Sequence, residues 1–179
     1  MYHPMKNRNN QEKNTYVRQH ILAALLELMR TQDFASISIQ TLADAAGVGR
    51  ASFYRNFASK EDVLQQESVR LTDAWKAQFE QEHPDGTPQQ DNEWLISLLD
   101  FYKEHAAFYL ALYHAGLSDI VLETILGYFD RAPETPNALA YLNSAVGYMI
   151  YGWIQEWMRR GMQESGTELA RMLAESQKT

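Results

Sequence analysis

Apolar residues recur every three to four positions along most of the 179-residue chain, which is the period of an amphipathic α-helix. The first such stripe covers about 15–30, and the longest covers about 137–160. Two polar runs that contain proline, 82–88 and 131–136, interrupt the pattern. No segment alternates with the period of a β-strand, and no internal repeat is present. The pattern therefore predicts an all-α protein of about nine helices.

The segment 39–64 contains two short apolar patterns separated by a glycine. The apolar face of the first pattern consists of Leu42, Ala43 and Ala46. Gly47 follows at the place where a sharp turn needs a residue that is free to take a positive φ. Phe53 and Phe57, four residues apart, give the second pattern its own buried face. This is the pattern of a helix-turn-helix, whose second helix enters the major groove of DNA.

Arg50, Ser52, Tyr54 and Arg55 point away from the apolar face of the second pattern, and the segment offers seven candidates for contacts with DNA. Contacts with bases, or close to them, are expected from Arg50, Ser52 and Arg55. Contacts with phosphates are expected from Thr41, Tyr54 and Lys60. Ala51 lies on the same predicted DNA-binding surface.

The segment resembles the DNA-binding domain of the TetR/AcrR family of transcription regulators. The residues that carry the resemblance are Leu42-Ala43, Ala46-Gly47-Val48, Ser52-Phe53-Tyr54, Phe57, Ser59-Lys60-Glu61 and Leu64. Gly49 stands where the family commonly has a Ser or Thr that caps the recognition helix, and Ala51 stands where it often has Gly. Because both positions lie near the DNA, the base preference of relatives cannot be transferred to this chain.

The resemblance implies a homodimer that binds double-stranded DNA at a near-palindromic operator. It also implies a small, partly apolar effector, whose binding shifts the helix that joins the two domains. We therefore expect a ligand-responsive repressor. The alternatives are a transcriptional activator, or a DNA-binding adaptor that is regulated by a protein partner instead of a small ligand. The Trp157-x-x-x-Gly161 pattern is similar to a C-terminal subtype that includes regulators of dihydroxyacetone kinase, but this does not identify an effector.

Three segments follow from these patterns: a disordered tail at 1–13, a DNA-binding domain at 14–64, and a helical regulatory and dimerisation domain at 65–179. The formal charge of −7 is divided unevenly, since residues 1–70 have nine basic and seven acidic side chains and the rest have seven and 16. An acidic body behind a mildly basic head would orient the protein on DNA and weaken nonspecific binding. The acidic charge is alternatively no more than a soluble surface.

The second domain contains 15 of the 21 aromatic residues, a composition that suits a cavity for a flat or apolar ligand. The residues expected to line such a pocket are Trp75, Phe79, Trp94, Phe101, Phe108, Tyr109, Tyr113, Met149 and Trp153. Aromatic residues at helical spacing can equally form an ordinary core.

The stripe of apolar residues within 137–160 has two faces. The face expected to cover the domain's own core consists of Leu139, Leu142, Val146, Met149, Ile150, Trp153 and Trp157. The face expected to form the dimer interface consists of Ala138, Tyr141, Ala145, Tyr148 and Gly152, whose small members allow close helix approach. The alternative is that Gly147 and Gly152 relieve crowding between helices within one subunit.

An enzyme is the competing class of function. The chain has no cysteine, and it has no motif of a metalloprotease, serine hydrolase, P-loop protein or dinucleotide-binding enzyme. Glu104 and His105 are adjacent, so they would point about 100° apart on a helix and make no ready catalytic pair. We therefore expect no enzyme activity, no catalytic residue, no metal and no cofactor. No apolar run approaches the roughly 20 residues of a membrane span, and we expect a cytoplasmic protein.

Overall fold

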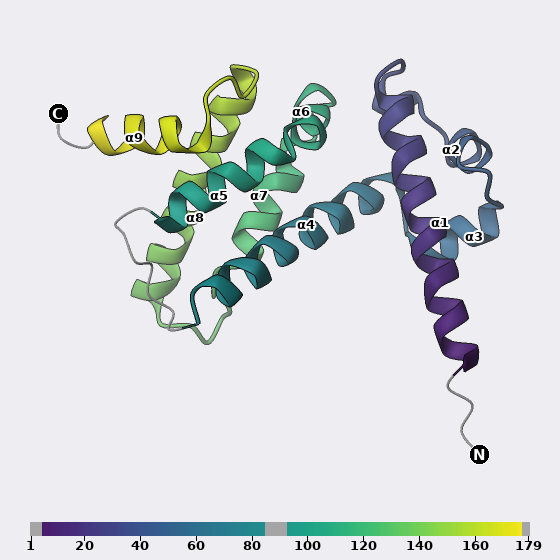
Figure 1. The fold of residues 1–179 in the computed structure, drawn as a ribbon, viewed down its shortest axis with the longest axis horizontal. Coiled ribbons are helices and arrows are strands. Elements are labelled where there is room, and N and C mark those ends of the chain that lie inside the picture. Colours follow the sequence, from purple (N-terminus) through teal and green to yellow (C-terminus); the bar gives the residue numbers. More distant parts are fainter. Residues whose placement is uncertain (1–4, 85–92, 177–179) are drawn as a thin grey trace. The chain divides into compact units, whose positions relative to one another are not determined.

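The computed structural model describes the backbone of residues 5–84 and 93–176 and the side chains of residues 14–84 and 93–175. The described residues form nine α-helices and one short 3-10 helix, with no strand (Figure 1). In chain order the elements are α1 (Met5–Met29), η1 (Phe34–Ser36), α2 (Ile39–Ala45), α3 (Arg50–Asn56), α4 (Lys60–Glu82), α5 (Glu93–Glu104), α6 (Ala106–His114), α7 (Ser118–Gly127), α8 (Asn137–Arg159) and α9 (Gly166–Ser176). The all-α fold class predicted from the hydrophobic period is confirmed.

The chain folds into two compact units, unit 1 (Met1–Glu67) and unit 2 (Ser68–Thr179). The division falls inside α4, three residues beyond the domain boundary that the sequence pattern predicted after residue 64. The helix α4 therefore begins in unit 1 and ends in unit 2.

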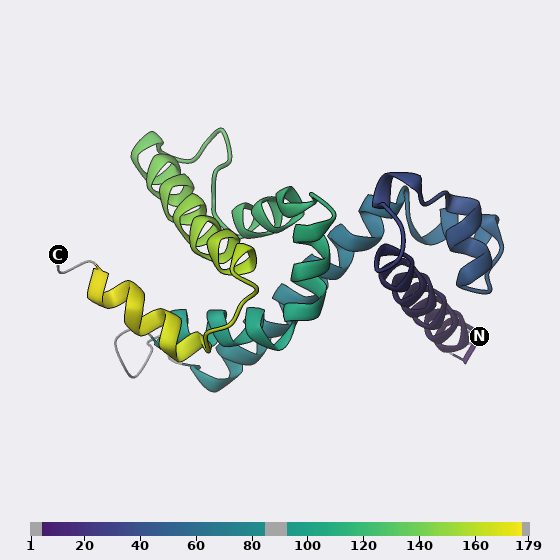
Figure 2. The same ribbon diagram turned by 90° about the horizontal axis from the view of Figure 1, so that it is seen from above.

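In unit 1, α1 packs against both α2 and α3, as Figure 1 and Figure 2 show. The buried side chains come from these three helices, from the connection after α1 and from the start of α4: Ile21, Leu25, Ile37, Leu42, Ala43, Ala46, Phe53, Phe57, Val63 and Leu64. Burial of one such Leu or Phe side chain stabilises a fold by roughly 1.5–3 kcal/mol. This core fixes the position of α3 relative to α1 and α2.

Three helices begin at serine side chains that cap their first turn. Ser38 Oγ accepts a hydrogen bond from the backbone N–H three residues later at 3.0 Å, at the start of α2. Ser59 Oγ does the same at 3.1 Å at the start of α4. At α9, Glu168 N–H donates to Ser165 Oγ at 3.2 Å and the Glu168 carboxylate accepts from Ser165 N–H at 2.8 Å, which is a capping box. Each cap satisfies a backbone donor that the helix itself leaves unpaired.

The first helix is longer than the sequence pattern indicated. We predicted a disordered tail at 1–13 and a helix from about Thr15, whereas α1 begins at Met5. The residues from Lys6 to Asn14 are polar but include no proline and no glycine, so nothing in them interrupts the helical hydrogen bonds. A polar composition alone therefore does not mark the end of this helix.

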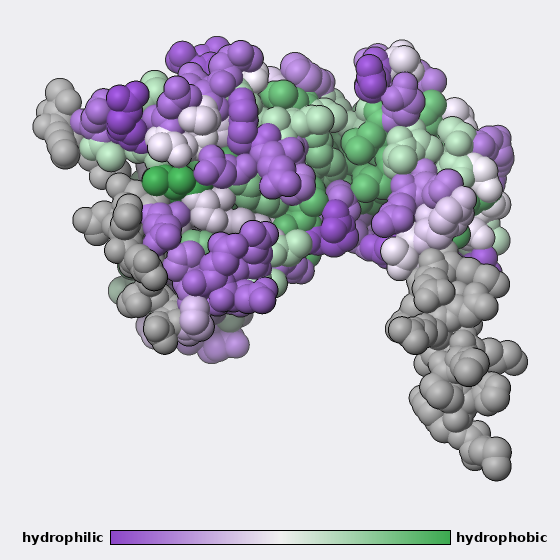
Figure 3. Space-filling model, in the orientation of Figure 1, coloured by the Kyte–Doolittle hydropathy of each residue, from purple (hydrophilic) through white to green (hydrophobic). Residues whose placement is uncertain are grey.

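In unit 2, α5 packs against α9 and α7 packs against α8, and Figure 2 shows α5 and α9 side by side. At Gly166, an added Cβ would lie 2.6 Å from the backbone nitrogen of Asp100, so only glycine allows α9 to approach α5 this closely. Gly147 allows a similar approach of α8 to α7, because an added Cβ would lie 2.6 Å from Leu126 Cδ2. On the face shown in Figure 3, hydrophilic residues form most of the surface near α9.

One prediction about α8 is wrong. We expected Leu139, Leu142 and Met149 to cover the core of their own domain, but their side chains are exposed in unit 2. Ile150 and Trp157, from the same predicted face, are buried. The helix is apolar on more than one side, and its period cannot decide which apolar residues face inward.

Candidate DNA interface and ligand cavities

The turn between α2 and α3 gives unit 1 its helix-turn-helix geometry. Gly47 has a φ of +66°, a left-handed conformation that costs an ordinary L-residue roughly 1–2 kcal/mol. The N–H of Val48 donates to the carbonyl of Ala43 at 2.9 Å and closes the end of α2. Leu42 and Phe53 are fully buried, one on each helix. The side of α3 that carries Phe53 is therefore fixed inward, and the other side is left for solvent or a partner.

The outward side of α3 is polar and basic. Arg50 is exposed at the first helical position, and its guanidinium has no hydrogen bond or ion pair to any described residue. The guanidinium of Arg55 donates to Ser52 Oγ at 2.6 Å, so these two side chains share one part of the surface. Tyr54 is 53% exposed, and its ring packs edge-on against Phe53 at 5.4 Å. Arginine is suited to bidentate recognition of guanine, and a tyrosine hydroxyl is suited to phosphate.

Thr41 and Ala51 are also exposed in unit 1. The Oγ1 of Thr41 lies 2.8 Å from Ser38 Oγ, at the start of α2. Six of the seven residues predicted to bind DNA are therefore exposed or half-buried on unit 1.

Lys60 is the seventh, and the structure engages its ammonium group within unit 1. Its Nζ donates to the backbone carbonyls of Phe34, Ala35 and Ile37, the last two at 3.3 and 2.9 Å. The same Nζ lies 4.4 Å from the centre of the Phe34 ring. An ammonium group has three donors, so this geometry ties α4 to the η1 connection and leaves little for a phosphate.

A second cationic residue, Arg18, also organises unit 1, and the sequence pattern did not indicate it. Arg18 Nη2 donates to Gln66 Oε1 at 2.5 Å, and the guanidinium lies 4.8 Å from the centre of the Phe57 ring. Arg18 therefore joins α1 to the end of α3 and to α4. No local pattern could have indicated this role, because both partners are far from Arg18 along the chain.

Unit 2 contains an apolar cavity of about 390 Å³ among α4, α5, α7 and α8. Its lining residues are Thr72, Trp75, Lys76, Phe79, Glu80, His83, Trp94, Leu98, Tyr102, Ile125, Tyr128, Phe129 and Ile150. The Tyr128 hydroxyl donates to Asp73 Oδ1 at 2.6 Å, and burial is the main cause that raises the pKa of Tyr128. A volume of this size and a largely apolar lining are typical of a site for a small organic ligand.

A second cavity of about 470 Å³, the acidic cavity, lies between α4 and α5. Its lining residues are Leu71, Ala74, Trp75, Gln78, Phe79, Glu82, His83, Glu93, Ile96, Ser97, Asp100, Phe101, Glu104 and His105. Of the residues that the structure describes, four carboxylates and two histidines line this cavity, and no lysine or arginine does.

Trp75, Phe79 and His83 line both cavities. His83 Nδ1 donates to the Phe79 carbonyl at 2.9 Å, its Nε2 lies 3.2 Å from Glu93 Oε1, and its ring stacks on Phe79 with centroids 4.2 Å apart. The Phe79 carbonyl, followed by Glu93, raises the pKa of His83. Trp75 Nε1 donates to Ser97 Oγ at 2.9 Å, which fixes the plane of the indole. The wall shared by the cavities is thus held by specific hydrogen bonds.

Four of the nine predicted pocket residues line these cavities: Trp75, Phe79, Trp94 and Phe101. The other five do not line either one. Phe108 and Tyr109 are buried, Tyr113 and Trp153 are half-buried, and Met149 is exposed.

The stripe predicted for dimerisation is exposed along α8. Its residues are Ala138, Tyr141, Ala145, Tyr148 and Gly152. Tyr141 is 75% exposed and Tyr148 is 54% exposed. Nothing lies within 4 Å of a Cβ added at Gly152, so this glycine does not relieve crowding within the subunit. Leu142 and Met149, also exposed, widen the stripe into an apolar face, which is the kind of surface that marks an interaction site.

The described part of the chain holds no cluster of three or more His, Asp or Glu side chains that could bind a metal ion. None of the described helices is long and apolar enough to cross a membrane.

Two family models match the chain. Residues 21–66 match the model described as bacterial regulatory proteins, tetR family. Residues 90–178 match the model described as a transcriptional regulator C-terminal region. The first match covers the helix-turn-helix, and the second begins just before α5 and reaches the end of α9.

Two curated relatives are similar over short segments. The HTH-type transcriptional regulator AlkX of Mycobacterium tuberculosis is 33% identical over 57 residues, which are 32% of this chain and 27% of that protein. The HTH-type transcriptional regulator EthR of Mycolicibacterium smegmatis is 50% identical over 44 residues, which are 25% of this chain and 20% of that protein. The matched segments thus span about a quarter of each relative's length.

Solved structures share the fold over nearly the whole chain. The crystal structure of Lin0861 from Listeria innocua aligns with a TM-score of 0.75 at 15% identity and covers 93% of this chain and 91% of that one. The fatty acid degradation regulator FadR from Bacillus halodurans aligns with a TM-score of 0.50 at 19% identity and covers 87% and 91%. Since a helix-turn-helix unit is followed by a helical second unit, and each matches a regulator model, the chain belongs to the TetR family of bacterial regulatory proteins.

Proposed function

We propose that this chain is a sequence-specific DNA-binding transcriptional repressor, which binds a near-palindromic operator as a homodimer and responds to a small, partly apolar effector. The observation that carries the proposal is the exposed basic side of α3, which the Gly47 turn and the buried Phe53 hold outward. Membership of a family of transcriptional regulators, which are not enzymes, supports it.

On the DNA, α3 of each subunit would lie in the major groove of one half-site. Arg50 and Arg55 would contact base edges, with Ser52 beside them, because arginine makes the commonest specific contact with guanine. Thr41 and Tyr54 would hold phosphates on either side of the groove. Two subunits related by a two-fold axis would place the half-sites about one helical turn or slightly more apart.

The exposed stripe of α8 supports dimerisation, since it is apolar and thin at Ala138, Ala145 and Gly152. The apolar cavity supports an effector, because its volume and lining suit a small ligand. The helix α4 lines this cavity and also carries residues of unit 1. A ligand that binds better to one position of α4 would therefore change the spacing of the two recognition helices in a dimer.

The first test is a selection of bound sites from random duplex DNA with the purified protein. We expect an enriched inverted repeat whose affinity falls steeply with salt concentration, because protein–phosphate contacts release counterions. Failure to enrich any sequence at low salt, with the protein folded, would contradict sequence-specific binding.

The second part of the test compares two arginine variants on the selected operator. Arg50→Ala should reduce discrimination between the operator and a site with one altered base by about 1–3 kcal/mol. Arg30→Ala is the matched control, because Arg30 is an exposed arginine of unit 1 whose partner is Glu27, at 3.5 Å. If Arg50→Ala discriminates as the control does, α3 does not read bases through Arg50.

A further inference from the structure

We propose that the acidic cavity is a binding site for an organic cation with an aromatic or bulky apolar body. This site has a chemistry different from that of the apolar cavity, to which the proposed function assigns the effector. The existence of the cation site does not rest on the proposed function. Only the consequence of occupancy for DNA binding rests on the proposed function.

The charge of the lining selects a cation. Glu82, Glu93, Asp100 and Glu104 contribute four carboxylates, and no lysine or arginine among the described residues lines the cavity to neutralise them. Glu93 pairs with His83, whose ring offsets one of the four negative charges when it is protonated and leaves the other three. The negative potential of this lining would attract a cation and repel an anion.

The apolar cavity offers a direct contrast. Its lining contains one lysine and one glutamate, Lys76 and Glu80, which lie 3.7 Å apart. The two cavities share the wall formed by Trp75, Phe79 and His83. The carboxylates that balance no lysine or arginine are found in the acidic cavity, and this difference in charge separates the ligands expected for the two cavities.

The aromatic part of the acidic cavity suits the body of such a ligand. Trp75 has its ring centroid 6.0 Å from that of Phe79 and 5.9 Å from that of Phe101, so three rings line one site. The hydrogen bond to Ser97 fixes the indole, and indole is the ring that attracts cations most strongly. A fixed ring loses no rotational freedom on binding, which favours affinity.

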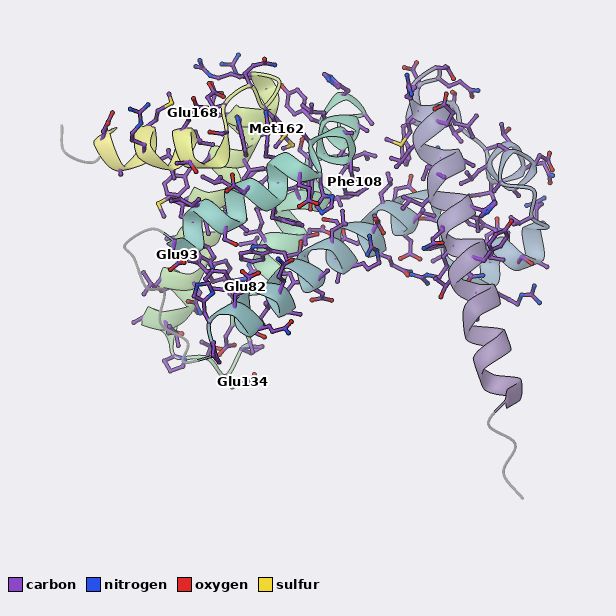
Figure 4. All side chains as sticks on the ribbon, viewed as in Figure 1. Glu82, Glu93, Phe108, Glu134, Met162 and Glu168 are labelled. Atoms are coloured by element: carbon purple, nitrogen blue, oxygen red, sulfur yellow. The ribbon has the colours of Figure 1, made fainter. Side chains whose placement is uncertain are left out.

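The size and access of the cavity fit a ligand of this class. Its volume of about 470 Å³ lies within the range of small-molecule sites. Glu82, at the end of α4, and Glu93, at the start of α5, lie on the same part of unit 2 in Figure 4 and both line the cavity. Glu82 accepts a hydrogen bond from Gln78 at 2.9 Å, an uncharged partner that leaves its negative charge in place.

The probe is tetraphenylphosphonium, and its control is tetraphenylborate, which has nearly the same shape and the opposite charge. Binding of each to the full chain is measured by isothermal titration calorimetry and by quenching of tryptophan fluorescence. We expect the cation to bind with one site per chain and at least about tenfold more tightly than the anion, with an affinity that falls as salt is raised. Equal or tighter binding of tetraphenylborate, or no binding of the cation, would overturn the proposal.

Two substitutions locate the site. Glu82→Gln and Glu104→Gln remove charge from exposed lining residues, and each should weaken binding of the cation about three- to tenfold, the effect of one nearby charge in a partly screened site. Glu134→Gln is the matched control, because Glu134 is exposed in the α7–α8 connection and lines neither cavity (Figure 4). Helicity by circular dichroism verifies that each variant is folded.

If the three variants bind the cation equally well, the cation occupies another site and the proposal is wrong. The operator selection distinguishes this failure from a failure of the proposed function. A protein that enriches an operator but does not bind the cation contradicts only the cation site. A protein that binds the cation in the acidic cavity but enriches no DNA contradicts only the repressor.

Discussion

Lys60 directs its three ammonium donors to backbone carbonyls of the connection between α1 and α2. We therefore expect Lys60→Ala to lower the free energy of unfolding by about 1–3 kcal/mol, since hydrogen bonds from a charged group are lost and carbonyls are left unpaired. Chemical denaturation in urea, followed by circular dichroism, measures this change. Lys76→Ala is the control, because Lys76 is exposed and its ion pair with Glu80, at 3.7 Å, should contribute little.

The same variant decides between this role and the phosphate contact that the family pattern predicts for Lys60. If the ammonium stays within unit 1, Lys60→Ala should leave the salt dependence of operator binding unchanged, after affinities are corrected for the fraction of the variant that is folded. A slope reduced by about one unit, together with normal stability, would instead mean that Lys60 releases the carbonyls and contacts a phosphate.

Residues whose partners are close in sequence were predictable. Ser38 and Ser165 cap helices, and Gly47 takes a positive φ, because each acts on backbone groups within three residues or on its own backbone. The partners of Lys60 lie 23 to 26 residues away and that of Arg18 lies 48 residues away, so only the folded chain shows these roles.

At the scale of elements, the outward face of α8 is expected to hold two subunits together. Tyr141→Glu combined with Tyr148→Glu should convert a dimer into a monomer, because two charges would be placed in an apolar contact. Both side chains are exposed within the subunit, so its helicity and fold should remain. Sedimentation equilibrium of the purified protein measures the change in mass.

The matched control is Tyr16→Glu, the same exchange at a tyrosine of α1 that is 60% exposed. A wild-type protein that is monomeric at micromolar concentration, or a double variant that remains dimeric, would exclude this face as the interface. A loss of dimer in the control would mean that added charge alone disrupts association.

The period of an apolar stripe predicted that α8 exists but not which residues face inward. Leu139 and Leu142 were expected in the core and are exposed, whereas Ile150 and Trp157 are buried as expected. A helix that is apolar on two sides can bury one side in the core of its own subunit and leave the other side exposed for a partner. The period also does not tell which aromatic residues line a cavity, since Trp75 and Phe79 line cavities whereas Phe108 and Tyr109 are buried in the core. Aromatic character alone does not separate the two.

At the scale of the whole molecule, a repressor needs coupling between a ligand site in unit 2 and α3 in unit 1. The helix α4 belongs to both units, and its first residue in unit 2 is Ser68. Ser68 Oγ lies 2.9 Å from Thr124 Oγ1 of α7, and both side chains are buried. A buried hydrogen bond between hydroxyls depends strongly on distance and direction, so it would distinguish two positions of α4 against α7.

We expect Ser68→Ala combined with Thr124→Val to weaken this coupling with little loss of stability, because both partners of the hydrogen bond are removed together. The measurement is operator affinity with and without saturating tetraphenylphosphonium, and cation affinity with and without operator. One ratio compares operator affinity with and without the cation, and the other compares cation affinity with and without operator. In the wild type these two ratios should be equal, since coupling between two binding sites is reciprocal. In the double variant both ratios should move toward one, while each affinity measured alone stays within about threefold of its wild-type value.

Thr135→Val is the matched control, because it removes a hydrogen bond of a buried threonine to Asp130, and neither residue belongs to α4 or α7. Coupling in this variant should equal that of the wild type. If the double variant also keeps the wild-type ratios, coupling between the two sites does not depend on the contact of α4 with α7. Any coupling would then have to pass through the other helices that share the cavity walls with α4, and α5, which contributes Trp94 and Leu98 to the apolar cavity and Phe101 to the acidic one, is the first of these to test.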